Sequence, residues 1–355
     1  MTANPHCYAC IMAGGGGERF WPMSRAKTPK HLLKLISERT LLEETVRRLK
    51  GVVRPANIFV LTNESQMKGI RSALPFLPAA QIVAEPERRD TAAAAALATA
   101  LARARDPKAV VALLPADHVI RNQRVFAAQL AAGFAWAADN PALLTIAVKP
   151  TDPDPSFGYL ELGARIPGRN AGGVFRRVKR FVEKPDIATA RRYLKTGRYA
   201  WNAGMFVWSA EVFLAEAERS APGLAAFIRG FPSGNPKTYL QTRFPSLPKL
   251  SVDYAIMEKA ARVATLMAEF DWDDVGLWTA LPPHLAVDVS GNAVRGPVVV
   301  VESTGNIAVS NGRVIALCGV HDLVVVETPD AILVCHRDAV QAIKRLHPQL
   351  PKEVL

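Results

Sequence analysis

The chain has 355 residues, of which 49% are hydrophobic and 21% charged, and its 44 basic and 32 acidic residues give a formal net charge of +12. This composition suits a globular chain with one large and one smaller domain. The positive charge favours anionic partners, but the basic residues are spread without a basic tail or interleaved aromatics, so we expect no nucleic-acid groove. No apolar run reaches the length of about 18 residues that a membrane span needs, so we expect no membrane partner either.

The first segment is apolar and carries two of the four cysteines. Cys7 and Cys10 have the spacing of a zinc or redox pair, but no second ligand pair follows at a suitable distance. We therefore interpret both as small strand residues with free thiols. Free thiols are typical of a reducing compartment, and the N-terminus lacks the charged and apolar regions of a secretory signal, so we expect a cytoplasmic protein.

Short apolar runs then alternate with helical patterns. The apolar runs stop at turn residues and cover residues 7–15, 57–62, 109–118 and 143–148. The helical patterns have a helix-favouring composition and cover residues 40–50, 91–106 and 124–139. Further strands are expected at 157–163, 178–185 and 205–209, and further helices at 211–220 and 252–262. The alternation predicts a doubly wound α/β sheet with buried parallel strands.

The pattern of the sequence changes after residue 287. Short β-branched strands separated by Gly, Asn, Asp and Pro run through residues 298–335, and a helical pattern follows at 338–346. This change predicts two domains, 1–287 and 288–355, the second being a coil of short strands or a small sandwich. The open ends of such a module need a cover from the first domain, the terminal helix or a second subunit. We favour the first domain, with a homodimer contact as an addition, and expect the module to carry no catalytic groups.

Four consecutive glycines, Gly14–Gly17, follow the first apolar run and precede the stretch ERFWPMSRAKTPK. A glycine run lets backbone N–H groups approach a phosphate closely. A P-loop would need Lys-Ser or Lys-Thr after the glycines, and a dinucleotide site would run directly into a helix, which Pro22 and Pro29 forbid. The long loop thus favours phosphate binding through nearby cations, which are Arg19, Arg25, Lys27 and Lys30.

Residues 11–35 closely resemble the G-G-x-G-x-R-L-W-P-x-S-R-x-x-P-K signature of sugar nucleotidyltransferases, and are most similar to that of the mannose-1-phosphate guanylyltransferases. The resemblance continues in order through AEPERRDTAAA, LLPADHVI, FGYLE, FVEKP, WNAGMFVW, VDYAIMEK and WDDVGLW. It implies a Rossmann-like nucleotidyltransferase domain followed by a short left-handed β-helix. The implied reaction transfers GMP from GTP to mannose 1-phosphate and releases pyrophosphate. The chain departs from the family pattern at Asp90, where Asn is frequent, and at Ala116 and Ala203, where Ser is common.

A magnesium site is expected next to the glycine loop. Asp117 follows an apolar strand, and ligands of open α/β sheets bind at the carboxyl ends of strands. A carboxylate there suits Mg²⁺, although an Asp that caps the next helix would give the same pattern. The resemblance places a second ligand directly before a Val-Gly pair, which implies Asp274 rather than its neighbours Asp271 and Asp273. The expected cofactor is therefore Mg²⁺, bound by Asp117 and Asp274.

The resemblance also implies which residues meet GTP. Arg19 offers a planar fork for β- and γ-phosphate oxygens, and Lys30 a point charge nearer to the α-phosphate. Guanine displays N–H donors that Glu85 or Asp90 can accept, unless backbone carbonyls do so instead. The expected nucleotide-binding residues are Gly14, Gly15, Gly17, Arg19, Arg25, Lys30, Glu85 and Asp90.

The sugar phosphate is expected to bind further along the chain. Lys184 of FVEKP is the implied partner of its phosphate, and the neighbouring Glu183 suits sugar hydroxyls. An exposed Glu-Lys pair without a ligand is the plain alternative. Gly158 and Asn202 are expected to line the sugar pocket, and Asp253 to accept a hydroxyl there.

Two alternatives stay open. The chain could be a nucleotidyltransferase of the same fold for glucose 1-phosphate, a heptose phosphate or another NTP, or it could be a non-catalytic regulatory homologue. A regulatory homologue has no need to keep Arg19, Lys30, Asp117, Lys184 and Asp274 together. Their joint presence favours catalysis.

Overall fold

The computed structural model describes residues 4–167 and 172–355. In these ranges nine strands form one sheet in the order β3-β2-β1-β4-β8-β5-β9-β7-β6. The strands are β1 (Cys7–Met12), β2 (Ile58–Asn63), β3 (Ile82–Glu85), β4 (Val110–Pro115), β5 (Leu143–Val148), β6 (Tyr159–Arg165), β7 (Val174–Val182), β8 (Tyr199–Ser209) and β9 (Val263–Met267). The first four strands are parallel, but β8 runs antiparallel between β4 and β5. The sheet is therefore doubly wound as expected, and mixed rather than all parallel.

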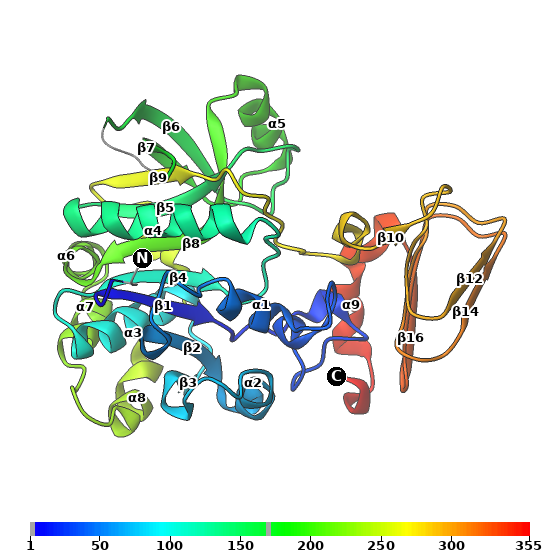
Figure 1. Cartoon of the computed structure of the whole chain (residues 1–355), viewed down its shortest axis with the longest axis horizontal. Helices are drawn as coiled ribbons and strands as arrows, with labels where there is room; N and C mark the ends of the chain where they lie inside the picture. The colour runs from blue at the N-terminus through cyan, green and yellow to red at the C-terminus, as the bar shows by residue number, and fades with distance from the viewer. Residues whose placement is uncertain (1–3, 168–171) are drawn as a thin grey trace.

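Helices cover both faces of this sheet (Figure 1). They are α1 (Leu41–Arg47), α2 (Met67–Ala73), α3 (Asp90–Arg105), α4 (Gln123–Asp139), α5 (Ile187–Thr196), α6 (Ala210–Ser220), α7 (Pro222–Arg229) and α8 (Lys237–Arg243). One core lies between the sheet and α3, α6 and α7, and the other between the sheet and α1, α2 and α4. Successive strand residues point to opposite faces, so Tyr8 and Cys10 of β1 serve the first core while Ala9 and Ile11 serve the second.

The strand order creates a ligand-binding edge between β1 and β4. The chain passes from β1 to β2 and β3 on one side, and returns to place β4 on the other side of β1. Ligands of open α/β sheets bind where the strand order reverses in this way, outside the carboxyl ends of the strands. The glycine loop leaves the end of β1, and Asp117 follows the end of β4.

The expected helix over residues 252–262 is instead a single π-helical turn, Asp253–Met257. Such turns are rare in proteins overall, and many of those that occur lie at functional sites. Here the turn buries Ala255, Ile256 and Met257 in the core, while Asp253 lines a cavity. The sequence pattern predicted the buried side of this segment but not its unusual backbone.

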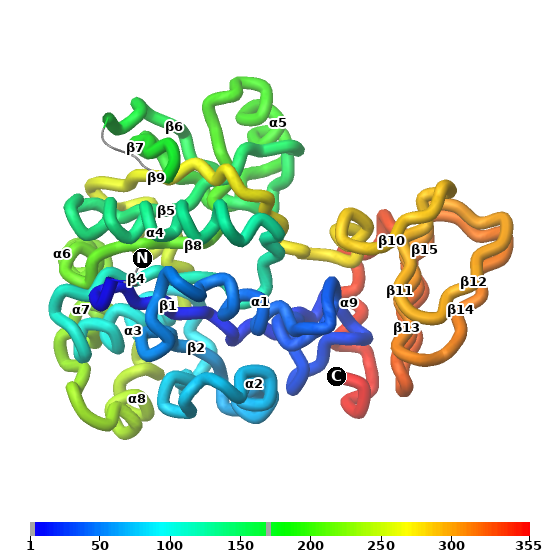
Figure 2. The backbone as a smooth tube through the Cα atoms, viewed as in Figure 1, coloured from blue at the N-terminus to red at the C-terminus, as the bar shows by residue number. Residues whose placement is uncertain are grey.

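Residues 286–336 form a coil of short strands in two layers (Figure 2). One layer contains β10 (Ala286–Val287), β11 (Ala293–Arg295), β13 (Ile307–Ser310), β15 (Leu323–Thr328) and β16 (Ala331–His336), and the other contains β12 (Val298–Val301) and β14 (Ile315–Cys318). The strands β11, β13 and β15 pair in parallel, as do β12 and β14. At one corner the buried Asn306 donates its Nδ2 hydrogens to Asn292 Oδ1 at 2.9 Å and to the Val320 carbonyl at 3.0 Å, which ties successive coils together. This arrangement confirms the coil and rules out the sandwich.

The tail, residues 286–355, shares a hydrophobic core with the loop that follows the glycines. Trp21 and Leu35 of the loop pack with Ile307 of β13 and Val324 of β15. The Trp21 indole N–H also donates to the Val354 carbonyl at 2.8 Å. The terminal segment is a 3₁₀ stretch followed by the short α9 (Ile343–Leu346), not one continuous helix. The tail thus docks on the first domain of the same chain, as expected, while the domain boundary itself stays a prediction.

Candidate active site

The glycine loop is folded tightly around Lys30. Gly17 has a φ of 67°, and a Cβ atom at this residue would lie 2.5 Å from the Lys30 Cβ, so only glycine fits. The Ser24 hydroxyl donates to the Gly17 carbonyl at 2.7 Å and holds the turn closed. As a result, Lys30 is directed inward and is buried, with an exposed fraction of 7%.

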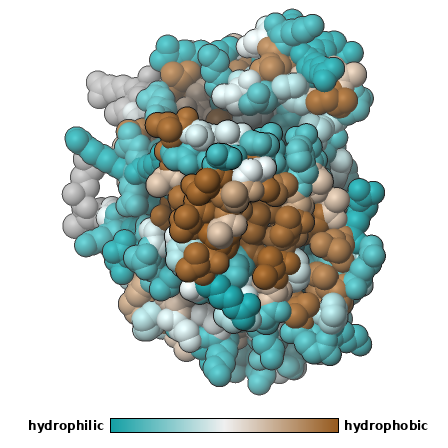
Figure 3. Space-filling view, turned by 90° about the vertical axis from the view of Figure 1, so that its right-hand side faces the viewer, coloured by the Kyte–Doolittle hydropathy of each residue, from teal (hydrophilic) through white to brown (hydrophobic). Residues whose placement is uncertain are grey.

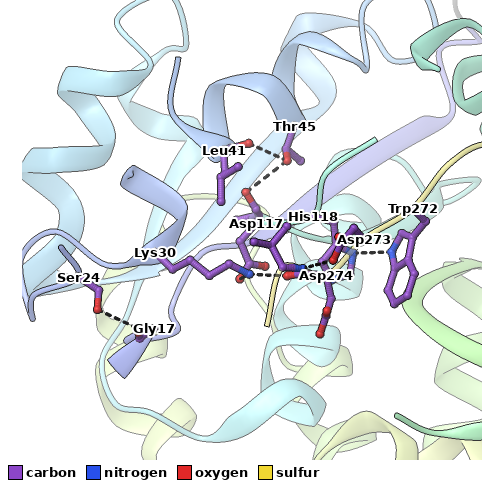
Figure 4. Close-up of polar contacts among 12 residues, drawn as sticks. Gly17, Ser24, Lys30, Leu41, Thr45, Asp117, His118, Trp272, Asp273 and Asp274 are labelled. Atoms are coloured by element: carbon purple, nitrogen blue, oxygen red, sulfur yellow. Dashed lines mark hydrogen bonds and ion pairs between the residues drawn. The ribbon is translucent and has the colours of Figure 1, made fainter. Parts of the chain in front are cut away.

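Lys30 connects the two expected metal ligands (Figure 4). Its ammonium donates to Asp117 Oδ2 at 2.8 Å and to the backbone carbonyl of Asp274. Burial by itself raises the pKa of Asp117, but the positive charge and hydrogen bond of Lys30, together with His118, outweigh it and lower that pKa to about 2. Asp117 is therefore a carboxylate at any physiological pH.

Asp274 is the acidic residue of its cluster that lines the cavity beside Asp117. Asp271 accepts backbone N–H groups of Arg121 and Asn122 at 2.9 and 2.7 Å. Asp273 accepts the Val275 N–H at 2.7 Å and contacts His284 Nε2 at 2.8 Å. These bonds give both rivals structural partners, which supports Asp274 as the ligand.

Burial raises the pKa of Asp274 to about 6, with Lys30 opposing the shift. Among the described residues, no hydrogen bond reaches the Asp274 carboxylate. A partly buried carboxylate without a partner is stabilised by a cation, so the pair of Asp117 and Asp274 suits a hard divalent ion that completes its coordination with water. Within residues 4–167 and 172–355, no group of three or more His, Cys, Asp or Glu side chains could hold a metal by itself.

The expected sugar residues line the same cavity, which has a volume of about 330 Å³. Asn202 of β8 donates to Asp253 Oδ1 at 3.1 Å and accepts the Thr145 hydroxyl at 2.6 Å. A Cβ on Gly158 would lie 2.5 Å from Glu183 Oε2, so this glycine makes room for the carboxylate. The cavity therefore brings together four of the five sugar residues that the sequence predicted, namely Gly158, Glu183, Asn202 and Asp253.

Two carboxyl groups of this cavity, those of Asp253 and Glu183, repel each other when both are ionised. Burial and the nearby Glu183 raise the pKa of Asp253 to about 7.

Lys184 does not line the cavity, and its ammonium pairs with Glu183 Oε1 at 2.6 Å while 60% of its side chain is exposed. The Lys184 backbone has a φ of 45°, an unusual value for a non-glycine residue.

A second cavity of about 340 Å³ adjoins the first at the glycine loop. It is lined by the predicted Gly14, Gly15, Glu85 and Asp90, and it shares Met12, Gly15 and Thr91 with the first cavity. Glu85 Oε1 is buried and has no hydrogen-bond partner among the described residues. Burial raises the pKa of Glu85 to about 8. The cavity thus offers a buried carboxyl oxygen without a hydrogen-bond partner beside a glycine backbone.

The structure does not bring every predicted residue to these cavities. Arg25 instead forms an ion pair with Asp330 of the tail at 2.9 Å. Arg19 lies in a 3₁₀ turn, Glu18–Phe20, and lines neither cavity. Within the described parts of the chain, Arg19 makes no hydrogen bond or ion pair, so its guanidinium is available to an anion.

Three cations that line the second cavity escaped the sequence analysis: Arg88, Arg89 and Lys249. The two arginines lie inside the motif that contains Glu85, so their position beside a predicted ligand was a usable signal. Lys249 lies in a loop outside every motif and gave no signal.

His118 lines the first cavity but is tied to its neighbours. It accepts the Trp272 indole N–H at Nδ1 at 3.1 Å. Burial lowers the pKa of His118 to about 4, so the imidazole is neutral.

The reversed strand order, the glycine loop and the carboxylate pair define a nucleotide-dependent transferase, and the sequence comparisons agree. Residues 8–285 match the Nucleotidyl transferase family, and residues 296–350 match the MannoseP isomerase/GMP-like beta-helix domain. The chain belongs to the nucleotidyl transferase family. This membership confirms the resemblance found in the signature loop and the expected fold of a Rossmann-like domain followed by a β-helix-like domain.

Several relatives match almost the whole chain. The xanthan biosynthesis protein XanB of Xanthomonas campestris pv. campestris (strain B100) is 37% identical over 347 residues, which cover 96% of this chain and 72% of the relative. A mannose-1-phosphate guanylyltransferase of Escherichia coli (strain K12) is 33% identical over 98% of this chain and 74% of its own length. The crystal structure of a mannose-1-phosphate geranyltransferase from Thermus thermophilus covers 97% of this chain and 99% of its own, with 32% identity and a TM-score of 0.87. No helix in the described ranges is long and apolar enough to span a membrane.

Proposed function

We propose that the chain is a mannose-1-phosphate guanylyltransferase, which transfers GMP from GTP to mannose 1-phosphate. A phosphate oxygen of mannose 1-phosphate attacks the α-phosphorus of GTP, a new P–O bond forms, and the bond from the α-phosphorus to the bridging oxygen breaks. GDP-mannose and pyrophosphate are the products. Both reactants are anions, so the protein must reduce their repulsion and align them, without a covalent intermediate.

The cavity around Glu85 suits the nucleoside. A carboxylate at Glu85 Oε1 accepts the N1–H or amino hydrogens of guanine, whereas adenine presents an acceptor at N1 and would meet repulsion. The unsatisfied Oε1 and the adjacent Gly14 support this assignment. The cavity is also lined by three cations, Arg88, Arg89 and Lys249. The triphosphate would extend along this positive charge toward Arg19.

Lys30 is the catalytic cation of this proposal. Its ammonium contacts Asp117, which lines the sugar cavity, and would stabilise negative charge that builds on the α-phosphate. Its bonds to Asp117 and to the Asp274 carbonyl fix the position of the ammonium before substrates bind. Preorganised charge of this kind needs no rearrangement during the reaction.

Mg²⁺ is the proposed cofactor. Asp117 and Asp274 would hold it, because both carboxylates line one cavity and that of Asp274 lacks any other partner among the described residues. When bound, the ion would neutralise phosphate charge and help to align the reactants. Nucleotidyl transfer generally depends on such a divalent ion.

The sugar would bind between Gly158, Glu183, Asn202 and Asp253. The Asn202 amide and the two carboxyl groups offer donors and acceptors for hydroxyls. Lys184 reaches the substrate phosphate if it exchanges its bond to Glu183 for one to the ligand, and its exposed side chain supports that freedom.

The observation that carries the proposal is the pair of adjoining cavities that meet at Gly15, with the Lys30–Asp117 ion pair at the first of them. The test is pyrophosphate release with GTP, ATP, UTP and dTTP, each combined with mannose 1-phosphate, glucose 1-phosphate or a heptose 1-phosphate. We expect turnover that needs GTP, mannose 1-phosphate and Mg²⁺ together. A preference for another pair would establish the alternative substrates, and no turnover of any pair by folded protein would favour a regulatory homologue.

We further propose a cytoplasmic location and a homodimer. The location follows from the metabolic substrates and the free cysteines. The dimer follows from the apolar side chains that the tail exposes (Figure 3), which include Val299, Val301 and Val314.

A further inference from the structure

The segment that carries Asp117 has no regular secondary structure. It begins directly after β4, and residues 116–118 form neither a helix nor a strand. Carbonyl groups in such a segment need partners from elsewhere in the protein, because no helix or strand ladder supplies them. The position of the Asp117 carboxylate therefore depends on the groups that hold the backbone before and after it.

Two side chains from α1 and its end hold this backbone. The Thr45 hydroxyl donates to the Ala116 carbonyl at 3.2 Å (Figure 4). Arg48, with which α1 ends, donates from Nη2 to the His118 carbonyl at 2.8 Å. Residues three positions apart lie on one side of a helix, so both side chains reach the same segment. The helix thus bonds to the residue before Asp117 and to the residue after it.

Arg48 is an expensive residue to bury for packing alone. It is 5% exposed, and among the described residues no carboxylate forms an ion pair with its guanidinium. Its Nε donates to the Glu44 carbonyl at 3.3 Å, and the guanidinium lies 5.8 Å from the centre of the Phe126 ring. A cation buried without a paired carboxylate costs free energy, and an apolar side chain would fill the same space without that cost. The bond to the His118 carbonyl is therefore the feature that only a long donor at this position provides.

The same segment is joined to the second proposed metal ligand. The Val119 N–H donates to the Asp273 carbonyl at 2.8 Å, and the Asp273 N–H donates to the Val119 carbonyl at 3.1 Å. This antiparallel bridge fixes the backbone beside Asp274 relative to the backbone beside Asp117. A displacement of residues 116–119 would therefore change the position of both carboxylates.

We propose that Thr45 and Arg48 are positioning residues of the metal site. Neither side chain lines the two substrate cavities. They act through the backbone on both sides of Asp117, and so set its carboxylate at the separation from Asp274 that a divalent ion needs. Mg²⁺ demands near-ideal octahedral geometry, and loss of a group that orients a metal ligand typically lowers metal affinity about 10–100-fold. The inference rests on the proposed function and adds two residues that none of its motifs contains.

The test measures binding of Mn²⁺, a paramagnetic substitute for Mg²⁺, by electron paramagnetic resonance of the free ion, with and without GTP. Thr45→Val keeps the shape of the side chain and removes the hydroxyl, whereas Thr45→Ser keeps the hydroxyl. We expect the Kd for Mn²⁺ to rise about tenfold in Thr45→Val and to stay within about twofold of wild type in Thr45→Ser. Wild-type affinity in Thr45→Val, or an equal loss in both variants, would overturn the role of the hydroxyl.

Thr99→Val is the matched control for a general loss of stability. Thr99 is a buried threonine of α3, on the other face of the sheet. Its hydroxyl donates to the carbonyl four residues earlier at 2.8 Å, as that of Thr45 does at 3.0 Å. Both valine variants should unfold at lower urea concentrations than wild type, but only Thr45→Val should lose affinity for Mn²⁺. Equal losses of affinity in the two variants would contradict the proposal.

Arg48→Met and Arg48→Lys provide the second comparison, because both replacements are long and only lysine keeps a cationic donor. We expect Arg48→Met to raise the Kd for Mn²⁺ about tenfold and Arg48→Lys to raise it less. In steady-state kinetics, Arg48→Met should raise the Mg²⁺ concentration that gives half-maximal rate and leave the KM for mannose 1-phosphate unchanged at saturating Mg²⁺. A changed KM with an unaltered Mg²⁺ dependence would refute the positioning role.

The metal titration separates this inference from the proposed function. A wild type that binds Mn²⁺ but turns over no substrate pair would refute the function, and the variants would still decide the positioning roles. A wild type that binds no Mn²⁺, with or without GTP, would overturn the positioning roles. Normal turnover by wild type together with wild-type Mn²⁺ affinity in Thr45→Val and Arg48→Met would refute the positioning roles alone.

Discussion

Glu85 should make guanine binding depend on pH in a defined direction. Burial raises its pKa to about 8, so the free protein at pH 7 holds this side chain mostly as the neutral acid. If guanine N–H groups require the carboxylate, binding must first remove a proton. Each pKa unit corresponds to about 1.4 kcal/mol, so this step costs about 1.4 kcal/mol at pH 7 and about 2.7 kcal/mol at pH 6.

Affinity for guanosine should therefore rise about tenfold per pH unit between pH 6 and 8 and then level off, because the apparent Kd scales with the competent fraction. Guanosine is the ligand of choice because it has no phosphate that titrates in this range. Calorimetric titrations at several pH values measure the slope and the protons released. Glu85→Gln is the control and should give a flat profile with weaker binding.

The opposite slope would refute this reasoning. If the neutral acid donates to guanine O6 or N7, affinity falls above pH 8 instead of reaching a plateau. A flat wild-type profile would remove Glu85 from the base contact altogether.

Other predictions concern the metal site, the cations and the tail. Asp117→Asn and Asp274→Asn should each abolish most activity at limiting Mg²⁺ and leave the far-ultraviolet circular dichroism unchanged; near-normal turnover in either variant would remove that residue from the metal site. Lys30→Ala should mainly lower kcat, whereas Lys184→Ala should mainly raise the KM for mannose 1-phosphate, and steady-state kinetics that show one signature for both would contradict separate roles. Ile307→Ala removes a fully buried side chain of the tail core and should lower the free energy of unfolding by about 2–5 kcal/mol in urea titrations; a change below about 1 kcal/mol would mean that the tail core contributes little.

Local sequence patterns predicted the parts of the site that depend on neighbours along the chain. The apolar run before Asp117 indicated a buried strand, and the strand end determined where the carboxylate lies. Gly17 was predicted from the run of glycines, although its close contact with Lys30 is visible only in three dimensions. The family resemblance, not the local pattern, indicated Asp274 as the metal ligand. Residues 271–274 contain three acidic candidates, and only their hydrogen bonds distinguish them.

Long-range contacts explain what the sequence could not predict. The sequence groups Arg25 with the phosphate-binding cations, but its partner Asp330 lies 305 residues further along the chain. Trp21 lies in the same charged loop, but it packs in the tail core and donates to the Val354 carbonyl. Contacts of this kind depend on where the tail docks, and no periodicity within the loop carries that information.

The core shared by Trp21, Leu35, β13 and β15 has a consequence for how the catalytic loop can move. A surface loop normally opens at little cost, independently of the rest of the protein. Here, peeling the loop away from the tail would expose the tail's own interior to water, so opening of the loop is coupled to unfolding of the coil. In folding terms, the segment that holds Lys30 belongs to the same cooperative unit as residues almost three hundred positions away. A transplant of this loop into another α/β scaffold would therefore have to carry the coil with it.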